Sequence, residues 1–186
     1  MKLDIKAVRH GDLTLHLITE ANIDSVLDLF RGYPDSDGMR AELDQEYRPT
    51  YDEQGRQTNY GFYTTLRGDL VGASLLGISD WRTLCGNTGA DTLLHARGRG
   101  VAPASKPALF HVGFRLLGLH RIETGCFVSN LASKRSIEKT PGFIHEGTFR
   151  ESGINDDGEF EDELRYSILR RDWERLYGAE QVEVVF

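Results

Sequence analysis

The sequence HARGRGVA, residues 95–102, places two arginines and two glycines between a predicted strand and a predicted long helix. Glycine allows unusual backbone angles at such a junction and lets a ligand approach the main chain closely. The start of a helix carries unpaired N–H groups and partial positive charge, so the stretch predicts a phosphate site. A plain strand-to-helix turn with surface arginines is the alternative. The stretch matches neither the P-loop nor the dinucleotide-binding glycine pattern.

The bulk properties indicate a soluble globular protein. We expect residues 1–186 to form a single domain, because this length suffices for one sizeable core. The net charge of −7 argues against a nucleic-acid binder, which needs many Lys and Arg contacts to phosphates. Cys85 and Cys126 lie in no Cys-x-x-Cys motif and no His-x-x-x-His pair occurs, so we predict no metal site. Without a long apolar run or a signal peptide, we expect a cytoplasmic protein that does not bind membranes.

The hydrophobic periodicity predicts an α/β (α+β) fold with one mixed sheet and helices packed against it. Strands are expected at 13–20, 59–66, 69–79, 90–95, 120–130, 142–152 and 159–170. Helices are expected at 21–30, in the first half of 36–58, at 101–118, at 132–140 and as a closing turn at 171–178. Residues 80–89 are expected to be a loop, and Pro107 to kink or shorten its helix. The apolar segment 181–186 is strand-like and could cover the edge of this sheet or of a partner's, which hints at a homodimer.

The run Arg97-Gly98-Arg99-Gly100-Val101-Ala102 resembles the Arg/Gln-x-x-Gly-x-Gly/Ala signature of the GNAT N-acetyltransferases. Four later segments resemble, in order, those of the Rim-type ribosomal-protein N-terminal acetyltransferases. These segments are LGLHRIE (117–123), VSNLASKRSIEK (128–139), GFIHEGTFRE (142–151) and DDGEFEDELRYSILRRDW (156–173). The resemblance is clearest over 86–174. Residues 1–58 match only in pattern and would form the variable acceptor side, and 175–186 would be a C-terminal extension.

The resemblance implies the GNAT fold, a mostly antiparallel sheet of six to seven strands with about four helices. Its two central strands splay into a V, here at 92–95 and 126–130, and acetyl-coenzyme A (acetyl-CoA) enters the gap. The resemblance implies cofactor contacts from the amides of Arg97, Gly98, Arg99, Gly100, Val101 and Ala102, from a backbone N–H near Leu93, and from Asn130 and Ser133. Asn130 also has an ordinary explanation as the N-cap of the following helix.

The implied reaction is direct transfer of an acetyl group from acetyl-CoA to a primary amine. Two groups that many relatives use are absent, because Ile137 stands where a tyrosine is common and Gly153 where a glutamate is found. Ser133 is the best substitute for the tyrosine as a proton donor. Asp91 and Glu151 are the candidate bases, Glu151 because it would share a face with position 153 in a regular strand. Each carboxylate is equally explained as a solvated surface group.

The absence of an obvious base favours an acceptor amine with a low pKa. An α-amine is about 15% neutral at pH 7, whereas a lysine side chain is only about 0.04% neutral. A site without an obvious base therefore favours a protein or peptide N-terminus. The alternatives are a small amine such as a polyamine, an aminoglycoside or an amino-acid-like metabolite, and a non-catalytic acetyl-CoA-binding protein. The acidic segment YPDSDGMRAELDQEY (33–47) would suit a polycation.

Overall fold

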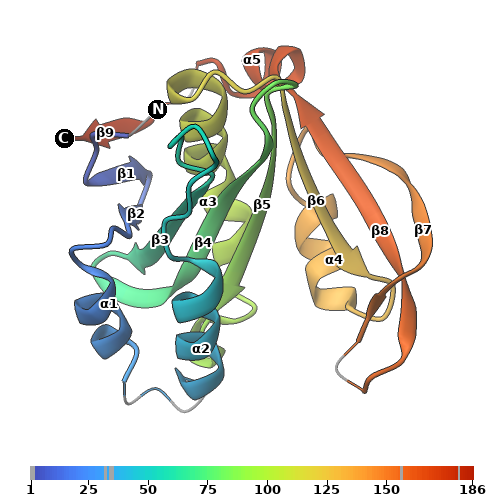
Figure 1. The fold of residues 1–186 in the computed structure, drawn as a ribbon, viewed down its shortest axis with the longest axis horizontal. Helices are drawn as coiled ribbons and strands as arrows, with labels where there is room; N and C mark the ends of the chain where they lie inside the picture. Colours follow the sequence, from blue (N-terminus) through green and yellow to red (C-terminus); the bar gives the residue numbers. More distant parts are fainter. Residues whose placement is uncertain (1–2, 32, 34–35, 156, 180) are drawn as a thin grey trace.

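A computed structural model describes residues 3–31, 33, 36–155, 157–179 and 181–186. In these residues nine strands form one sheet in the order β7-β8-β6-β5-β4-β3-β2-β1-β9 (Figure 1). The strands are β1 (Ala7–His10), β2 (Leu13–Leu17), β3 (Asn59–Leu66), β4 (Asp69–Asp80), β5 (Cys85–Thr92), β6 (Arg121–Phe127), β7 (Ile144–Ile154), β8 (Phe160–Leu169) and β9 (Glu183–Val185). The helices are α1 (Ile23–Leu29), α2 (Ser36–Glu46), α3 (Val101–Phe110), α4 (Leu131–Glu138) and α5 (Arg170–Tyr177). The mixed, mostly antiparallel sheet is confirmed. β1 was not predicted, whereas β9 lies in the segment 181–186 that was expected to be strand-like.

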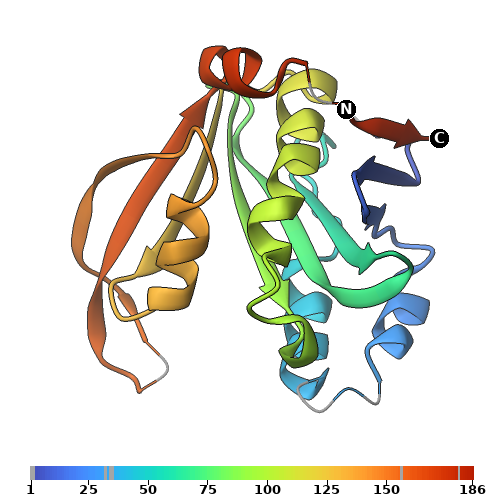
Figure 2. The same ribbon diagram turned by 180° about the vertical axis from the view of Figure 1, so that it is seen from behind.

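Helices cover both faces of the sheet. α1 and α2 lie on the face toward the viewer in Figure 1, and α3 and α4 lie on the opposite face, shown in Figure 2. The core beneath α3 includes Phe62, Leu76 and Phe110, and a second cluster beneath α1 and α2 includes Phe30 and Leu43. Burial of each such side chain stabilises the fold by about 1.5–3 kcal/mol. No helix in the described ranges is long and apolar enough to span a membrane.

The expected loop at 80–89 is wrong in its second half, where β5 already begins at Cys85. One of the glycines that make this segment resemble a loop, Gly86, is needed for close packing instead. A Cβ atom on Gly86 would lie 2.7 Å from the carbonyl oxygen of Gly77 on β4. β5 also ends earlier than expected, because residues 94–96 form a turn of 3-10 helix.

Pro107 was expected to kink or shorten its helix, but the helix continues beyond it. α3 runs through Pro107 to Phe110 and passes directly into a wider π-type segment, His111–Leu116. A proline removes one backbone hydrogen bond from the helix. The next three residues, Ala108 to Phe110, are fully buried against the sheet. Tertiary packing therefore holds the helix where the local propensity is unfavourable.

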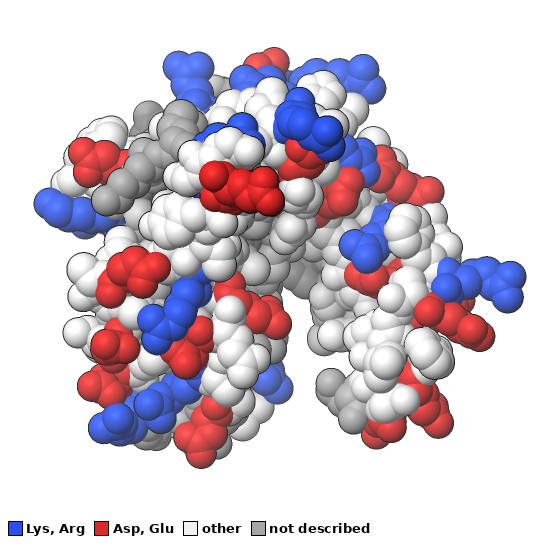
Figure 3. Space-filling model, viewed as in Figure 1, with Lys and Arg blue, Asp and Glu red and all other residues white. Residues whose placement is uncertain are grey.

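β5 and β6 are the only neighbouring strands of the described sheet that run parallel, and they soon separate. They pair only from Cys85↔Arg121 to Asn87↔Glu123. Beyond these three pairs β5 stays with β4 as far as Thr92, while β6 stays with β8 as far as Phe127. Figure 1 shows the two strands diverging, which confirms the splay between two central strands. The space-filling view shows an open notch in the same place (Figure 3), which we call the β5–β6 cleft. The Asn87–Glu123 pair marks its closed end.

The C-terminal strand pairs within its own chain. β9 lies antiparallel to β1, with Ala7 opposite Val185 and Arg9 opposite Glu183. Residues 183–185 therefore cover the edge of this sheet. The suggestion of a homodimer loses the support that it drew from this segment.

An ion-pair network braces the arm formed by β6, β7 and β8. The Arg121 guanidinium donates hydrogen bonds to Glu123, Glu146 and Ser167, and the Ser167 hydroxyl donates to Glu146 at 2.8 Å. The hydrogen bond from Arg121 is the main cause that lowers the pKa of Glu146 to about 2. Because the folded-state pKa lies below the unfolded value of 4.5, Glu146 stabilises the fold above that pH. This contribution is lost as the pH falls from 4.5 toward 2.

We predict that Glu146→Gln lowers the free energy of unfolding by about 1 kcal/mol at pH 7, a modest figure because the carboxylate is partly exposed to solvent. The difference from the wild type should shrink between pH 4.5 and pH 2 in denaturant titrations. Glu53→Gln, at an exposed carboxylate in the loop before β3, is the control and should leave the pH dependence unchanged. Parallel pH curves for the wild type and Glu146→Gln would contradict the prediction.

Candidate active site

The glycine-arginine turn offers a set of backbone donors. Gly98 and Gly100 adopt left-handed backbone angles, with φ of +74° and +76°, and Gly100 is the N-cap of α3. In the described part of the chain their N–H groups donate to no protein acceptor. Val101 and Ala102 follow in the first turn of the helix, where N–H groups have no intrahelical acceptor. Pro103 also lies in this turn and has no N–H to lose, so it is tolerated as expected.

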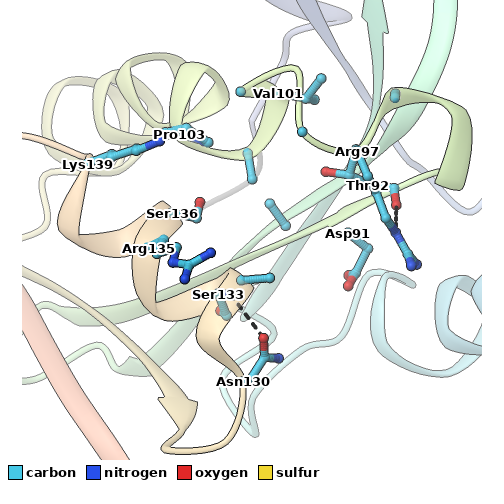
Figure 4. Close-up of a pocket in the computed structure, with 16 residues that line it drawn as sticks. Asp91, Thr92, Arg97, Val101, Pro103, Asn130, Ser133, Arg135, Ser136 and Lys139 are labelled. Carbon is cyan, nitrogen blue, oxygen red and sulfur yellow. Dashed lines mark hydrogen bonds between the residues drawn. The ribbon is translucent and has the colours of Figure 1, made fainter.

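A cavity of about 490 Å³ lies between this turn, β5 and α4 (Figure 4). It is lined by Ala90, Asp91, Thr92, Ala96, Arg97, Gly98, Gly100, Val101, Ala102, Pro103, Asn130, Ala132, Ser133, Arg135, Ser136 and Lys139. Three of these, Arg97, Arg135 and Lys139, are cationic. Arg97 also donates from Nε to the carbonyl oxygen of Thr92 at 3.2 Å. Free helix-start amides beside three cations form a site suited to a phosphate-bearing ligand.

The structure brings most of the predicted site residues together. The predicted residues that line the cavity are Asp91, Arg97, Gly98, Gly100, Val101, Ala102, Asn130 and Ser133. Arg99 is an exposed residue of the turn, and Arg99, Leu93 and Glu151 are not among the lining residues. Arg135 and Lys139 line the cavity but were not predicted as site residues from the sequence. Their spacing of four residues on one helix face was the signal available for finding them.

Leu93 cannot supply the backbone donor predicted near it. Its N–H donates to Val71 of β4 at 2.9 Å, and the residue is fully buried. The carbonyl of Thr88 instead points across the cleft, where it accepts from Thr124 Oγ1 at 2.9 Å. Because backbone N–H and C=O groups alternate in direction along a strand, those of Ala90 and Thr92 also point into the β5–β6 cleft. A shift of one residue along the strand reverses the direction of the amide, so the donor predicted near Leu93 cannot be the Leu93 N–H itself.

The start of α4 forms the opposite wall of the cavity. Asn130 Oδ1 accepts the N–H of Ser133 at 3.0 Å, which confirms that Asn130 is the N-cap. Burial raises the pKa of the Cys126 thiol, and a hydrogen bond from Ser133 acts in the opposite sense. Ile137 is 4% exposed and packs with Cys126 and Tyr166, so this position faces the sheet and not the cavity. Ser133 of α4, in contrast, lines the cavity.

Asp91 receives a partner from the N-terminal half of the chain. The Tyr47 hydroxyl, just after α2, donates a hydrogen bond to Asp91 Oδ2. Tyr47 is 2% exposed, whereas Asp91 is half-buried and lines the cavity, as Figure 4 shows. The two residues are 44 positions apart, and no sequence signal links them. Residues 1–58 therefore supply a hydrogen bond to this carboxylate of the cavity.

Glu151 loses the geometric basis for its predicted role. The register of β7 against β8 shifts between Phe149 and Gly153, and Glu151 has a φ of +46° within this irregular stretch. Its N–H donates to Asp162 Oδ1 at 2.8 Å, and the residue is exposed. The expectation of a regular strand is wrong here. Its two-residue spacing from Gly153 therefore does not place the Glu151 carboxylate on the same face of the strand as position 153.

Comparison with known proteins agrees with this architecture. The family model for the acetyltransferase (GNAT) domain matches residues 12–143. The uncharacterized N-acetyltransferase YnaD of Bacillus subtilis (strain 168) is 35% identical over 75 residues, which are 40% of this chain and 43% of YnaD.

Two solved structures share the fold at low sequence identity. One is a spermidine N-acetyltransferase SpeG chimera from Vibrio cholerae and hSSAT, with a TM-score of 0.67 and 18% identity over 89% of this chain and 99% of that chain. The other is the dodecameric spermidine N-acetyltransferase of Vibrio cholerae, with a TM-score of 0.65 and 19% identity over 92% of this chain and 100% of that chain. The chain therefore belongs to the GNAT acetyltransferases, a family of acyl-transferring enzymes.

Proposed function

We propose that this chain transfers an acetyl group from acetyl-CoA to a primary amine, most favourably the α-amine of a peptide or protein N-terminus. The turn at residues 97–102, which we call the phosphate-suited turn, lines one cavity together with the Asp91 carboxylate, and this observation carries the proposal. Bound acetyl-CoA would supply an acetyl group that is activated as a thioester. The residues of the chain would hold the cofactor, orient the amine and take up its proton.

The turn fits a diphosphate. A Cβ atom built on Gly98 or Gly100 meets nothing within 4 Å, so the space beside both residues is open to a ligand. The backbone N–H groups of Gly98, Gly100, Val101 and Ala102 would hold the pyrophosphate, with Arg97, Arg135 and Lys139 supplying charge. The cleft-facing N–H groups of Ala90 and Thr92 would pair with carbonyl groups of the cofactor, as an added strand pairs with a sheet edge. The Ser133 hydroxyl would donate a hydrogen bond from the opposite wall.

Asp91 would take the proton of the acceptor amine. An amine enters water-filled sites largely as an ammonium ion and becomes a nucleophile only after it loses a proton. Asp91 is the carboxylate among the residues that line the cavity, and Tyr47 holds it in place. A carboxylate is a weak base, so it is better matched to an α-amine with a pKa of about 7.8 than to a lysine with a pKa of about 10.4.

A polyamine is the second candidate acceptor, because the fold is shared with spermidine N-acetyltransferases. Figure 3 shows acidic side chains on both sides of the notch between the α1–α2 side and the β6–β8 side. On the α1–α2 side, two exposed carboxylates form ion pairs, since Asp44 pairs with Arg48 and Asp28 pairs with Arg31. Pro34 and Asp35 of the acidic segment lie outside the described residues.

Release of free coenzyme A should distinguish the acceptors. We expect peptides with a free N-terminus to be used with a kcat/KM at least tenfold above that of spermidine, and N-terminally blocked peptides that contain lysine to be poor acceptors. The reverse order would favour a polyamine acetyltransferase. Tight binding of acetyl-CoA without turnover of any amine would instead support the non-catalytic alternative.

Asp91→Asn should lower kcat by about 10²- to 10³-fold at pH 7, because the amine then loses its proton receptor. The loss should diminish at alkaline pH, where more of the amine is already neutral. Tyr47→Phe should give a smaller decrease, since it removes only the support of the carboxylate. Asp69→Asn, in the exposed turn that begins β4, is the matched control. Full activity of Asp91→Asn at pH 7 would remove Asp91 from this role.

Gly100→Ala should raise the KM for acetyl-CoA at least tenfold, because the added methyl group occupies the space through which the phosphate approaches the backbone. Gly11→Ala is a matched control in the β1–β2 turn, where φ is +56° and a Cβ atom likewise meets nothing within 4 Å. Both substitutions should cost about 1 kcal/mol of stability from backbone strain. A similar KM for the two variants would contradict the placement of the pyrophosphate.

A further inference from the structure

Lys106 is a buried cation that the proposed reaction has not used. The residue is 4% exposed and lies on the side of α3 that faces the sheet. Its Nζ donates to Thr88 Oγ1 at 3.2 Å, and this is its one hydrogen bond in the described part of the chain. An ammonium group has three donors, so two lack a protein acceptor. Burial of a charge with so few partners is costly, and an apolar side chain would suit a purely structural position better.

Thr88 places this ammonium at the closed end of the β5–β6 cleft. Thr88 follows Asn87, the last residue of β5 that pairs with β6, and its carbonyl accepts from Thr124 Oγ1 across the gap. Ala90, whose N–H points into the cleft, lies two residues further, about 7 Å along the strand. Along α3, Lys106 is five residues from Val101, about 7.5 Å along the helix axis. The ammonium therefore lies at the closed end of the cleft, and its helix leads back to the phosphate-suited turn.

The charge environment of Lys106 is simple. Burial lowers its pKa to about 8, and the nearby carboxylate of Asp91 acts in the opposite sense. Among the described residues, Asp91 is the one charged group whose charge shifts the pKa of Lys106. The group that contacts the ammonium from β5 is the neutral hydroxyl of Thr88. At pH 7 the side chain thus remains mostly cationic in a poorly solvated place.

We propose that Lys106 is a charge-stabilising residue of the acyl transfer, whose ammonium stabilises the negative charge on the departing sulfur. This inference rests on the proposed function. In the transfer a C–N bond forms, the C–S bond breaks, and its electron pair goes to the sulfur. The proton that the ammonium ion loses before attack goes to Asp91 and on to solvent. The second N–H proton goes to Asp91 as the amide forms, and the sulfur anion takes a proton from solvent on release. A cation in a poorly solvated site attracts such an anion more strongly than a solvated cation does.

Lys106→Met tests the proposal, because methionine has a similar length and no charge. We expect kcat to fall by about 10- to 100-fold, with a change of less than threefold in the KM for acetyl-CoA. The melting temperature should stay the same or rise, since a buried charge is removed. The folded-state pKa of about 8 lies below the unfolded value of 10.5. The stability gain should therefore be full below pH 8 and vanish as the pH rises toward 10.5.

Titration of bound coenzyme A gives a readout that needs no turnover. The ultraviolet absorbance of its thiolate should show a lower thiol pKa in the wild type than in Lys106→Met, by at least one pH unit. Thr124→Val is the matched control, because it removes a hydrogen bond at the same end of the cleft and keeps the charge. Its thiol pKa should equal that of the wild type. If Lys106→Met does not fold, Lys106→Gln replaces it in both measurements.

The outcomes separate this proposal from the function on which it rests. The role of Lys106 alone would be overturned if the wild type is active and Lys106→Met keeps a kcat within threefold of it. The same conclusion would follow if the thiol pKa of bound coenzyme A is equal in the two proteins. Loss of the fold in both Lys106 variants would also overturn it, by showing that the cation is structural. A wild type that releases no coenzyme A with any amine would overturn the proposed function.

Discussion

β5 and β6 form three parallel residue pairs and then separate, and the site follows from this broken ladder. Backbone N–H and C=O groups that lose their neighbour must be satisfied by water or by a ligand. On β5 the groups without a strand partner belong to Ala90 and Thr92, which line the cavity, and of these the Thr92 carbonyl accepts from Arg97 Nε. α3 begins soon after β5 ends, and α4 begins soon after β6 ends. The phosphate-suited turn and the Asn130–Ser133 wall are therefore placed on opposite sides of the gap by chain connectivity.

The closed end of the cleft is braced, which allows the open end to remain unpaired. Thr124 links β6 to the Thr88 carbonyl of β5, and Arg121 ties β6 to Glu146 of β7. The hydrogen bond from Arg121 lowers the pKa of Glu146 from 4.5 to about 2, so its carboxylate stays ionised and the network persists in mildly acidic solution as well. The two arms can thus diverge while their common end stays fixed. A ligand then enters a preformed gap, which reduces the ordering cost of binding.

Local features of the site could be predicted from the sequence, and features that depend on register or on distant contacts could not. The turn at 97–102 was identified because its glycines and its place before a helix are local signals. The direction of the Leu93 amide depends on strand register, where a shift of one residue reverses the result. The pairing of Tyr47 with Asp91 spans 44 positions and has no local signature. The glycines of β5 resembled a loop, since the sequence does not show that Gly86 packs against Gly77 and Leu119.

The same strand separates the two charges that the proposed reaction needs. Asp91 bonds Tyr47 on the α2 side of β5, whereas Thr88 holds Lys106 on the α3 side. Side chains alternate between the faces of a strand, so positions 88 and 91 necessarily point to opposite faces. A direct ion pair would satisfy both charges and remove their use, and none joins Asp91 and Lys106 in the described chain. The carboxylate thereby stays available to a proton on one face while the ammonium stays available to an anion on the other.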